Sequence, residues 1–246
     1  MLEVQGLSRA FGGLKAVDAV DLDVAEGAIV ALIGPNGAGK TTCFAAIAGF
    51  VRVDAGCVVF GGQDVSGWPP HRIAAAGMVR TFQITQPFSR LSVLENIMVG
   101  SYLRTGDRRT AMAAATEVAQ QVGMGAMLAT PAGELTVAGR KRLELARALA
   151  TKPKLLLLDE VMAGLNPIEI GEIVGVVRAI NARGVTILLI EHVMQAVMSL
   201  AERIHVLNQG RIIARGTPGE IARDAHVVEA YLGHGAAAKL GGRAHA

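Results

Sequence analysis

The sequence predicts an α/β fold built around a mainly parallel β-sheet. Three short apolar runs, AIVALIG, KLLLLDE and VTILLIEH, are typical of strands that are buried on both faces. Helical patterns separate these runs, as in repeated strand–helix–strand units. The length of 246 residues suits one large domain, or a core with an inserted smaller lobe.

Composition and charge narrow the class of protein. Hydrophobic residues make up 51% of the chain, so a sizeable core can form, and the net charge of +3 gives no argument for a nucleic-acid partner. Cys43 and Cys57 are too few for a disulfide framework. The N-terminus has no secretory pattern, and no apolar run reaches the roughly 18 residues of a membrane span. We expect a soluble cytoplasmic protein.

The elements of the first half follow in order. Residues 17–27 alternate between apolar and polar, as a half-buried strand does, and residues 28–34 form a buried strand ending in glycine. Residues 40–50 predict a helix that closes at Gly49. Residues 56–65 predict another strand, and Pro69 and Pro70 begin a short helix. The mostly helical pattern from about residue 87 to 133 separates two strand-rich stretches and predicts an inserted helical lobe.

The second strand-rich stretch begins at residue 154. After it, Asn166, Pro167 and Glu169 predict a helix start, in which Asn caps, Pro takes the first helical position and Glu reaches back to the cap. This helix should end near Gly184. Residues 185–192 predict a buried strand, and residues 203–216 predict two strands around an Asn-Gln-Gly turn. The small and polar residues 234–246 predict a flexible tail.

The clearest chemical motif is GPNGAGKT, at residues 34–41, which fits a phosphate-binding loop between a strand and a helix. Glycines let the backbone turn its N–H groups towards phosphate oxygens, and the following helix presents its positive end to the same anion. Lys40 would reach the β- and γ-phosphates, and the Thr41 hydroxyl would ligate Mg²⁺. The alternative is a glycine-rich turn without a ligand.

Three further sites could complete this chemistry. Asp159 ends a buried strand and could hold Mg²⁺, while Glu160, on the other side of the strand, could polarise a water molecule. His192 also ends a buried strand and could orient that water or donate to the γ-phosphate, or simply bond to a backbone carbonyl. Gln83, in VRTFQ, could ligate Mg²⁺ or be an ordinary surface residue.

These motifs stand in one order: phosphate loop, glutamine, the stretch LTVAGRKRLELARALA at residues 135–150, Asp-Glu strand and histidine. With a helical insertion between them, this order resembles the ATP-binding subunit of ABC transporters, from Leu2 to about Gly233. The chain looks most like the ATPases of branched-chain amino-acid importers. The pieces that carry this likeness are GLKAVDAVDLDV, VRTFQ, LSVLENIMVG, DEVMAGLNPIEI, EHVMQAVMSLAERIHVLNQGRIIARGTPGEI and AYLG.

The resemblance implies the fold and the roles of individual residues. It implies one domain over residues 1–233, with a P-loop NTPase core (1–86 and 134–233), an N-terminal antiparallel β subdomain and the helical lobe at about 87–133. Phe11 would stack on adenine, and Gln83 would sense the γ-phosphate and couple to the membrane subunit. The implied catalytic residues are Lys40, Glu160 and His192, and the implied Mg²⁺ ligands are Thr41, Gln83 and Asp159. The implied ATP-binding residues are Phe11, Gly34, Pro35, Asn36, Gly37, Ala38, Gly39, Lys40, Thr41, Thr42, Gln83 and Asp159.

Residues 135–139 correspond to the family signature Leu-Ser-Gly-Gly-Gln, which caps the γ-phosphate held by the opposite subunit. Leu135 and Thr136 keep the first two positions, Val137 and Ala138 replace the glycines, and Gly139 replaces glutamine. An added methyl could crowd the phosphate, and a positive φ at Ala138 would be unfavourable. We therefore expect a weakened signature and a heterodimer with a second ATPase subunit whose signature is intact.

The implied partners are that second ATPase subunit, integral permease subunits contacted through the surface around residues 83–90 and the helical lobe, and, indirectly, a periplasmic solute-binding protein. The protein would then lie on the inner face of the cell membrane. Alternative functions are the ATPase of a lipid or lipopolysaccharide exporter, a non-transport ATPase acting on ribosomes or DNA, and a catalytically inactive regulatory subunit.

Overall fold

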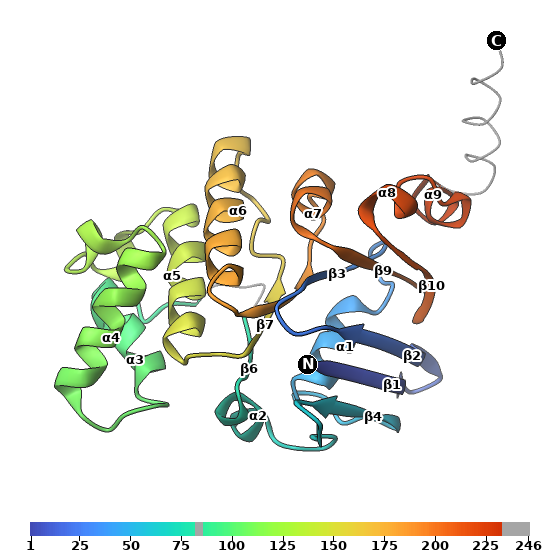
Figure 1. Ribbon diagram of the computed structural model, residues 1–246, viewed down its shortest axis with the longest axis horizontal. Coiled ribbons are helices and arrows are strands. Elements are labelled where there is room, and N and C mark those ends of the chain that lie inside the picture. The colour runs from blue at the N-terminus through green and yellow to red at the C-terminus, as the bar shows by residue number, and fades with distance from the viewer. Residues whose placement is uncertain (82–85, 233–246) are drawn as a thin grey trace, which may run out of the picture.

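The computed structural model describes residues 1–81 and 86–232, and two β-sheets form its framework (Figure 1). Within these residues the larger sheet has six strands in the order β10-β9-β3-β8-β7-β6. Its neighbours pair in parallel, except that β10 runs antiparallel to β9. The predicted mainly parallel sheet is therefore confirmed. Its strands are β3 (Ile29–Ile33), β6 (Met78–Arg80), β7 (Leu155–Asp159), β8 (Thr186–Ile190), β9 (Arg203–Asn208) and β10 (Arg211–Gly216).

The smaller sheet is antiparallel and confirms the predicted N-terminal β subdomain. Among the described residues its order is β2-β1-β4-β5. The single strand predicted over residues 56–65 is wrong, because two strands form a hairpin there and the Gly61–Gly62 pair makes the turn between them. The strands are β1 (Leu2–Phe11), β2 (Leu14–Val24), β4 (Ala55–Phe60) and β5 (Gln63–Asp64).

Helices cover both sides of the larger sheet. Helices α3 and α4 fall within the range predicted for the helical lobe, and α5 contacts both of them. The domain boundaries stay predictions, and the predicted tail at 234–246 lies outside the described residues. None of the helices described is long and apolar enough to cross a membrane. The helices are α1 (Lys40–Ile47), α2 (Pro70–Ala76), α3 (Val93–Ser101), α4 (Arg108–Gln121), α5 (Val137–Ala150), α6 (Pro167–Asn181), α7 (Met194–Leu200), α8 (Pro218–Ile221) and α9 (Ala225–Leu232).

The helix start predicted at residue 166 is confirmed. The Asn166 side chain accepts from the backbone N–H of Ile168 and of Glu169, both at 3.0 Å. The Glu169 carboxylate in turn accepts from the backbone N–H of Asn166 at 2.9 Å. Pro167 takes the first helical position, where its missing N–H costs nothing. The helix ends at Asn181, close to the predicted end.

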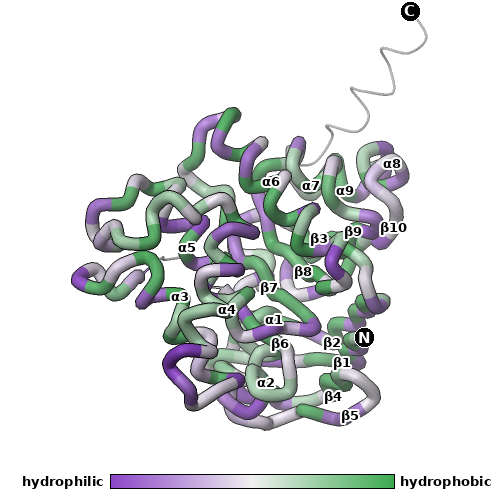
Figure 2. The backbone as a smooth tube through the Cα atoms, turned by 60° about the vertical axis from the view of Figure 1, so that its left-hand side comes forward, coloured by the Kyte–Doolittle hydropathy of each residue, from purple (hydrophilic) through white to green (hydrophobic). Residues whose placement is uncertain are grey.

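The core consists of two layers, one on each face of the larger sheet. Strand β3 is buried throughout, so its side chains alternate between the layers: Ile29, Ala31 and Ile33 belong to one, Val30 and Leu32 to the other. The first layer includes side chains of α5, α6 and α7, and the second includes those of α1 and the antiparallel sheet. Figure 2 shows the central strands β3 and β7 as predominantly hydrophobic. Because these strands are packed on both faces, the two core layers hold the strand ends in place. The candidate site lies at those ends.

Candidate functional site

The phosphate-binding loop connects the end of β3 to the start of α1, as the sequence predicts. Gly39 caps α1 with φ of 104° and without a side-chain hydrogen bond, so the first N–H groups of the helix are not used by a capping side chain. A Cβ at Gly39 would collide with the backbone oxygen of Ala16, so this position requires glycine for space as well as for its φ. The loop is therefore suited to bind an anion through its backbone.

Lys40 is buried at the base of this loop. Its Nζ donates to the backbone oxygens of Gly34, at 2.7 Å, and Pro35, at 3.0 Å. Burial lowers the pKa of Lys40, and the negative charges of Glu160 and Asp159 act against this change. The loop lysine and the two carboxylates predicted from the sequence therefore lie in one electrostatic neighbourhood.

A cavity of 720 Å³ lies over the loop and brings together most of the predicted site residues. Phe11, the last residue of β1, is half exposed at this cavity, and the Arg9 guanidinium lies 4.7 Å from the centre of its ring. Glu160 and His192 also line the cavity, with Asn36 to Thr42 of the loop and the start of α1. Gln83 lies outside the described residues. The tertiary structure thus brings together residues from positions 11 to 192.

Glu160 and His192 are in direct contact across this cavity. His192 Nε2 lies 2.7 Å from Glu160 Oε1. The backbone N–H of Glu160 donates to the oxygen of Ile190 at 2.9 Å, and Lys141 Nζ donates to the Glu160 backbone oxygen at 3.1 Å. Glu160 has φ of 51°, in the left-handed region, so it does not continue the strand. The alternation of a regular strand, on which the prediction for its side chain rests, therefore does not apply at this residue. His192 bonds to a carboxylate instead of the backbone carbonyl of the simpler interpretation.

Sequence reasoning missed Glu191, which is fully buried beside these two residues. Its Oε1 accepts from the backbone N–H of Met162 at 2.9 Å. Burial raises the pKa of the Glu191 carboxyl to about 7, although hydrogen bonds from the backbone N–H groups of Met162 and His192 act against this rise. Glu191 thereby joins the loop after Glu160 to the segment that carries His192. An acid inside the apolar run 185–192 was the only available signal.

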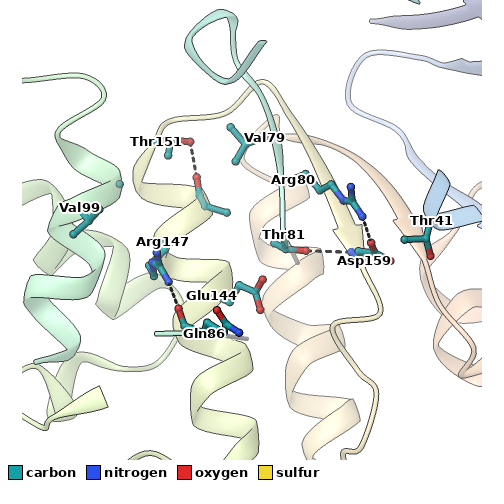
Figure 3. Close-up of a pocket in the computed structure, with 12 residues that line it drawn as sticks. Thr41, Val79, Arg80, Thr81, Gln86, Val99, Glu144, Arg147, Thr151 and Asp159 are labelled. Carbon is teal, nitrogen blue, oxygen red and sulfur yellow. Dashed lines mark hydrogen bonds and ion pairs between the residues drawn. The ribbon is translucent and has the colours of Figure 1, made fainter. Parts of the chain in front are cut away.

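Asp159 lies at a second cavity, of 710 Å³, which Figure 3 shows with Arg80, Thr81 and Thr41 around the carboxylate. Arg80 Nη2 lies 2.7 Å from Asp159 Oδ2, and both side chains are buried. The backbone N–H of Asp159 donates to Thr81 Oγ1 at 3.1 Å. The other carboxylate oxygen, Oδ1, is buried without a hydrogen-bond partner among the described residues. Sequence reasoning missed Arg80, because nothing local to VRTFQ says that β6 pairs with β7.

The stretch 135–139 is an ordinary helix start in its local geometry. Thr136 is the N-cap of α5, and its Oγ1 accepts from the backbone N–H of Gly139 at 3.1 Å. Ala138 lies in the first turn and is not among the residues with positive φ, so the concern about its backbone conformation does not apply. Val137 is exposed, and Ala138 is buried.

Comparison with known proteins identifies the family. A family model described as "ABC transporter" matches residues 17–163, and one described as "Branched-chain amino acid ATP-binding cassette transporter" matches residues 211–237. The high-affinity branched-chain amino acid transport ATP-binding proteins BraF of Pseudomonas aeruginosa and LivG of Escherichia coli are each 40% identical to this chain. Each match covers 95% of this chain and 98% of the relative.

Two further similarities are informative. The lipopolysaccharide export system ATP-binding protein LptB of Escherichia coli is 36% identical, over 94% of this chain and 97% of its own length. A crystal structure of a nucleotide-free ATP-binding cassette from an ABC transporter superposes with a TM-score of 0.87 at 31% identity, over 95% of this chain and 99% of that one. The phosphate loop at the end of β3, the paired Glu160 and His192, and these similarities lead to one conclusion. The chain belongs to the family of ABC transporter ATP-binding subunits.

Proposed function

We propose that this chain binds and hydrolyses ATP to power the import of branched-chain or other amino acids, or similar small solutes, through a membrane permease. The observation that carries the proposal is the convergence of Lys40, Glu160 and His192 on one cavity. The 40% identity to two ATP-binding proteins of branched-chain amino acid transport, over 95% of the chain, supports the substrate class.

The nucleotide would lie in the 720 Å³ cavity. Backbone N–H groups of the loop and the positive end of α1 would hold its phosphates. Lys40, now bonded to the oxygens of Gly34 and Pro35, would turn to the β- and γ-phosphates. Phe11 would stack on the adenine, because its half-exposed ring lines the cavity. The full binding set is residues 34–42 with Phe11, Asp159 and Gln83, the last outside the described residues.

The side chains near Asp159 fit Mg²⁺. Oxygen atoms are the ligands that this cation prefers, and the buried Asp159 Oδ1 has no hydrogen-bond partner in the described part of the chain. Thr41 lines the same cavity as Asp159. We assign Thr41 and Asp159 to the metal, together with Gln83. When bound, Mg²⁺ would neutralise charge that develops on the phosphates during cleavage.

Hydrolysis would be carried by Glu160 and His192. Glu160 would accept a proton from the attacking water, and its carboxylate is held at 2.7 Å by the imidazole of His192. The hydrogen bond from Lys141 to the Glu160 backbone oxygen fixes the backbone behind that carboxylate. This support matters, because a small misplacement of a catalytic group can cost a large factor in rate.

The partner of the signature residues would be a second ATPase subunit. Thr136 and the start of α5 would reach the γ-phosphate held by that subunit, and the methyl group of Ala138 would narrow the space for that phosphate. We therefore propose a heterodimer in which the partner carries an intact signature. If restoring glycine at both Val137 and Ala138 left transport-coupled ATPase activity unchanged, the proposed asymmetry would be wrong.

The permease would dock beside the helical lobe. The 710 Å³ cavity reaches from Asp159 to Val99 and Gly100 of α3. Exposed apolar side chains lie on and next to α3, namely Val99, Tyr102 and Leu103, and Phe88 precedes it. Such a patch favours a protein partner over open solvent. The chain would then lie on the inner face of the membrane, with a periplasmic solute-binding protein acting only through the permease and with no nucleic-acid partner.

A second candidate function rests on the 36% identity to the ATP-binding protein of lipopolysaccharide export. The two functions differ in their permeases, so affinity purification of the tagged chain from membranes separates them. Recovery of amino-acid permease subunits supports the importer. Recovery of lipid-extracting permease subunits contradicts it.

The ATPase itself is tested by the solution mass of Glu160→Gln protein with and without ATP and Mg²⁺. This variant should bind ATP without turnover, and an ATP-dependent homodimer would indicate that residues 135–139 still hold a γ-phosphate. A monomer that binds ATP would favour a separate partner subunit. Lys40→Ala in the same background is the control and should lose nucleotide binding. Normal ATP turnover by Lys40→Ala alone would refute the site.

A further inference from the structure

Arg80 lies at the end of β6, and its guanidinium contacts the carboxylate that we assign to Mg²⁺. Strands β6 and β7 pair in parallel with Arg80 opposite Leu157, so the ends of both strands meet at the same edge of the sheet. The Nη2–Oδ2 distance to Asp159 is 2.7 Å, with side-chain exposures of 8% for Arg80 and 0% for Asp159. Figure 3 shows the Arg80 side chain directed at Asp159, with Thr41 of α1 beside the pair.

This contact is a charged pair at a buried site. A buried carboxylate is costly unless a cation and hydrogen bonds compensate it, and an arginine stays protonated at any ordinary pH. The Arg80 guanidinium also lies 5.8 Å from the centre of the Phe50 ring, so an aromatic face supports it from the loop after α1. The fold therefore holds the positive charge of Arg80 next to the Asp159 carboxylate.

The same carboxylate has a second oxygen available for a metal. Asp159 Oδ1 is buried without a hydrogen-bond partner among residues 1–81 and 86–232. Thr41, the other ligand within these ranges, lines the same cavity as Arg80 and Asp159. A cation at Oδ1 and the guanidinium at Oδ2 would share one negative charge, and each would weaken the attraction of the carboxylate for the other.

We propose that Arg80 is a positioning residue that weakens the binding of the divalent metal by Asp159. It holds the carboxylate in place through Oδ2 and offsets part of its charge, so that the metal binds tightly only together with the nucleotide phosphates. The inference rests on the proposed function, because it takes Asp159 as a metal ligand. It makes a directional prediction: loss of the Arg80 charge should strengthen metal binding, whereas general damage to the site should weaken it.

The test measures the binding of Mn²⁺, as a probe for Mg²⁺, to the full chain in the presence of ADP. Free Mn²⁺ is followed by electron paramagnetic resonance at pH 8. Arg80→Met should lower the Kd for Mn²⁺ by about tenfold, the factor that corresponds to about 1.4 kcal/mol and to the low end of a charged hydrogen bond. Arg80→Lys keeps the charge and should stay close to the wild-type Kd.

The matched control is Arg147→Met. Arg147 lines the same cavity, but its Nη1 donates to the backbone oxygen of Gln86 at 3.2 Å, so its loss should leave the Kd unchanged. An unchanged or higher Kd in folded Arg80→Met would overturn the inference. If that variant does not fold, Arg80→Gln replaces it under the same criterion. Failure of the wild-type chain to bind Mn²⁺ with ADP would instead contradict the proposed function, so the two failures are distinguishable.

Discussion

Replacing Glu191 by glutamine should change the way in which stability depends on pH. The Glu191 carboxyl is 1% exposed, and burial raises its pKa from 4.5 to about 7. The folded state therefore binds the proton more tightly than the unfolded state does. The stabilising contribution of the protonated carboxyl is complete below pH 4.5 and is lost as the pH rises through about 7. Because one pKa unit corresponds to about 1.4 kcal/mol, the loss between pH 5 and pH 8 is about 2–3 kcal/mol.

Glutamine is neutral throughout this range, so Glu191→Gln removes the loss. Its side-chain oxygen can still accept from the backbone N–H of Met162, and any change in the second hydrogen bond, from His192, is independent of pH. The assay is urea unfolding of both proteins at pH 5, 6, 7 and 8. The free energy of unfolding of the variant, relative to wild type, should rise by about 2–3 kcal/mol from pH 5 to pH 8.

The control for this experiment is Glu26→Gln, which changes an exposed carboxyl. Its difference from wild type should stay nearly constant over the same pH range. A difference between Glu191→Gln and wild type that is also constant, or that falls as the pH rises, would contradict a raised pKa of the buried Glu191 carboxyl.

Three further variants test the site and its supports. Phe11→Ala should weaken nucleotide binding by about 1–3 kcal/mol, as loss of base–aromatic stacking does elsewhere, while Phe11→Tyr should bind normally in a fluorescent-nucleotide titration. Thr136→Ala should lower the free energy of unfolding by about 1 kcal/mol, because the backbone N–H of Gly139 loses the hydroxyl to which it donates. Thr136→Ser keeps that hydroxyl and should have a free energy of unfolding close to that of wild type. Gly100→Ala should cost about 1–3 kcal/mol, because its Cβ would meet the backbone oxygen of Arg147 where α3 crosses α5. A Cβ at Gly106 would meet no atom within 4 Å, so Gly106→Ala should leave the free energy of unfolding nearly unchanged in the same denaturation assay.

The features of the fold and of the site that are formed by residues close together in the chain were predictable from the sequence. The phosphate loop, the cap at Asn166 and the buried strands before Asp159 and His192 are determined by residues close together in the chain. The backbone preferences of glycine and proline and the pattern of apolar residues act between residues that are close together in the chain. The antiparallel N-terminal subdomain was implied only by the family resemblance. The hairpin at residues 55–64 replaces a single predicted strand, because Gly61 and Gly62 both have positive φ and turn the chain.

The fold class, the phosphate loop, and the acids and histidine at the strand ends all follow from the order of residues along the chain. Which of these side chains are in contact depends on how the strands are arranged in the folded sheet. The Arg80–Asp159 pair depends on β6 lying beside β7, and the Glu160–His192 contact depends on β7 lying beside β8. Strand order is set by the packing of the whole sheet between two core layers, whose energy belongs to no short segment. For the same reason the raised pKa of Glu191 could not be predicted, since its cause is burial by residues distant in the chain.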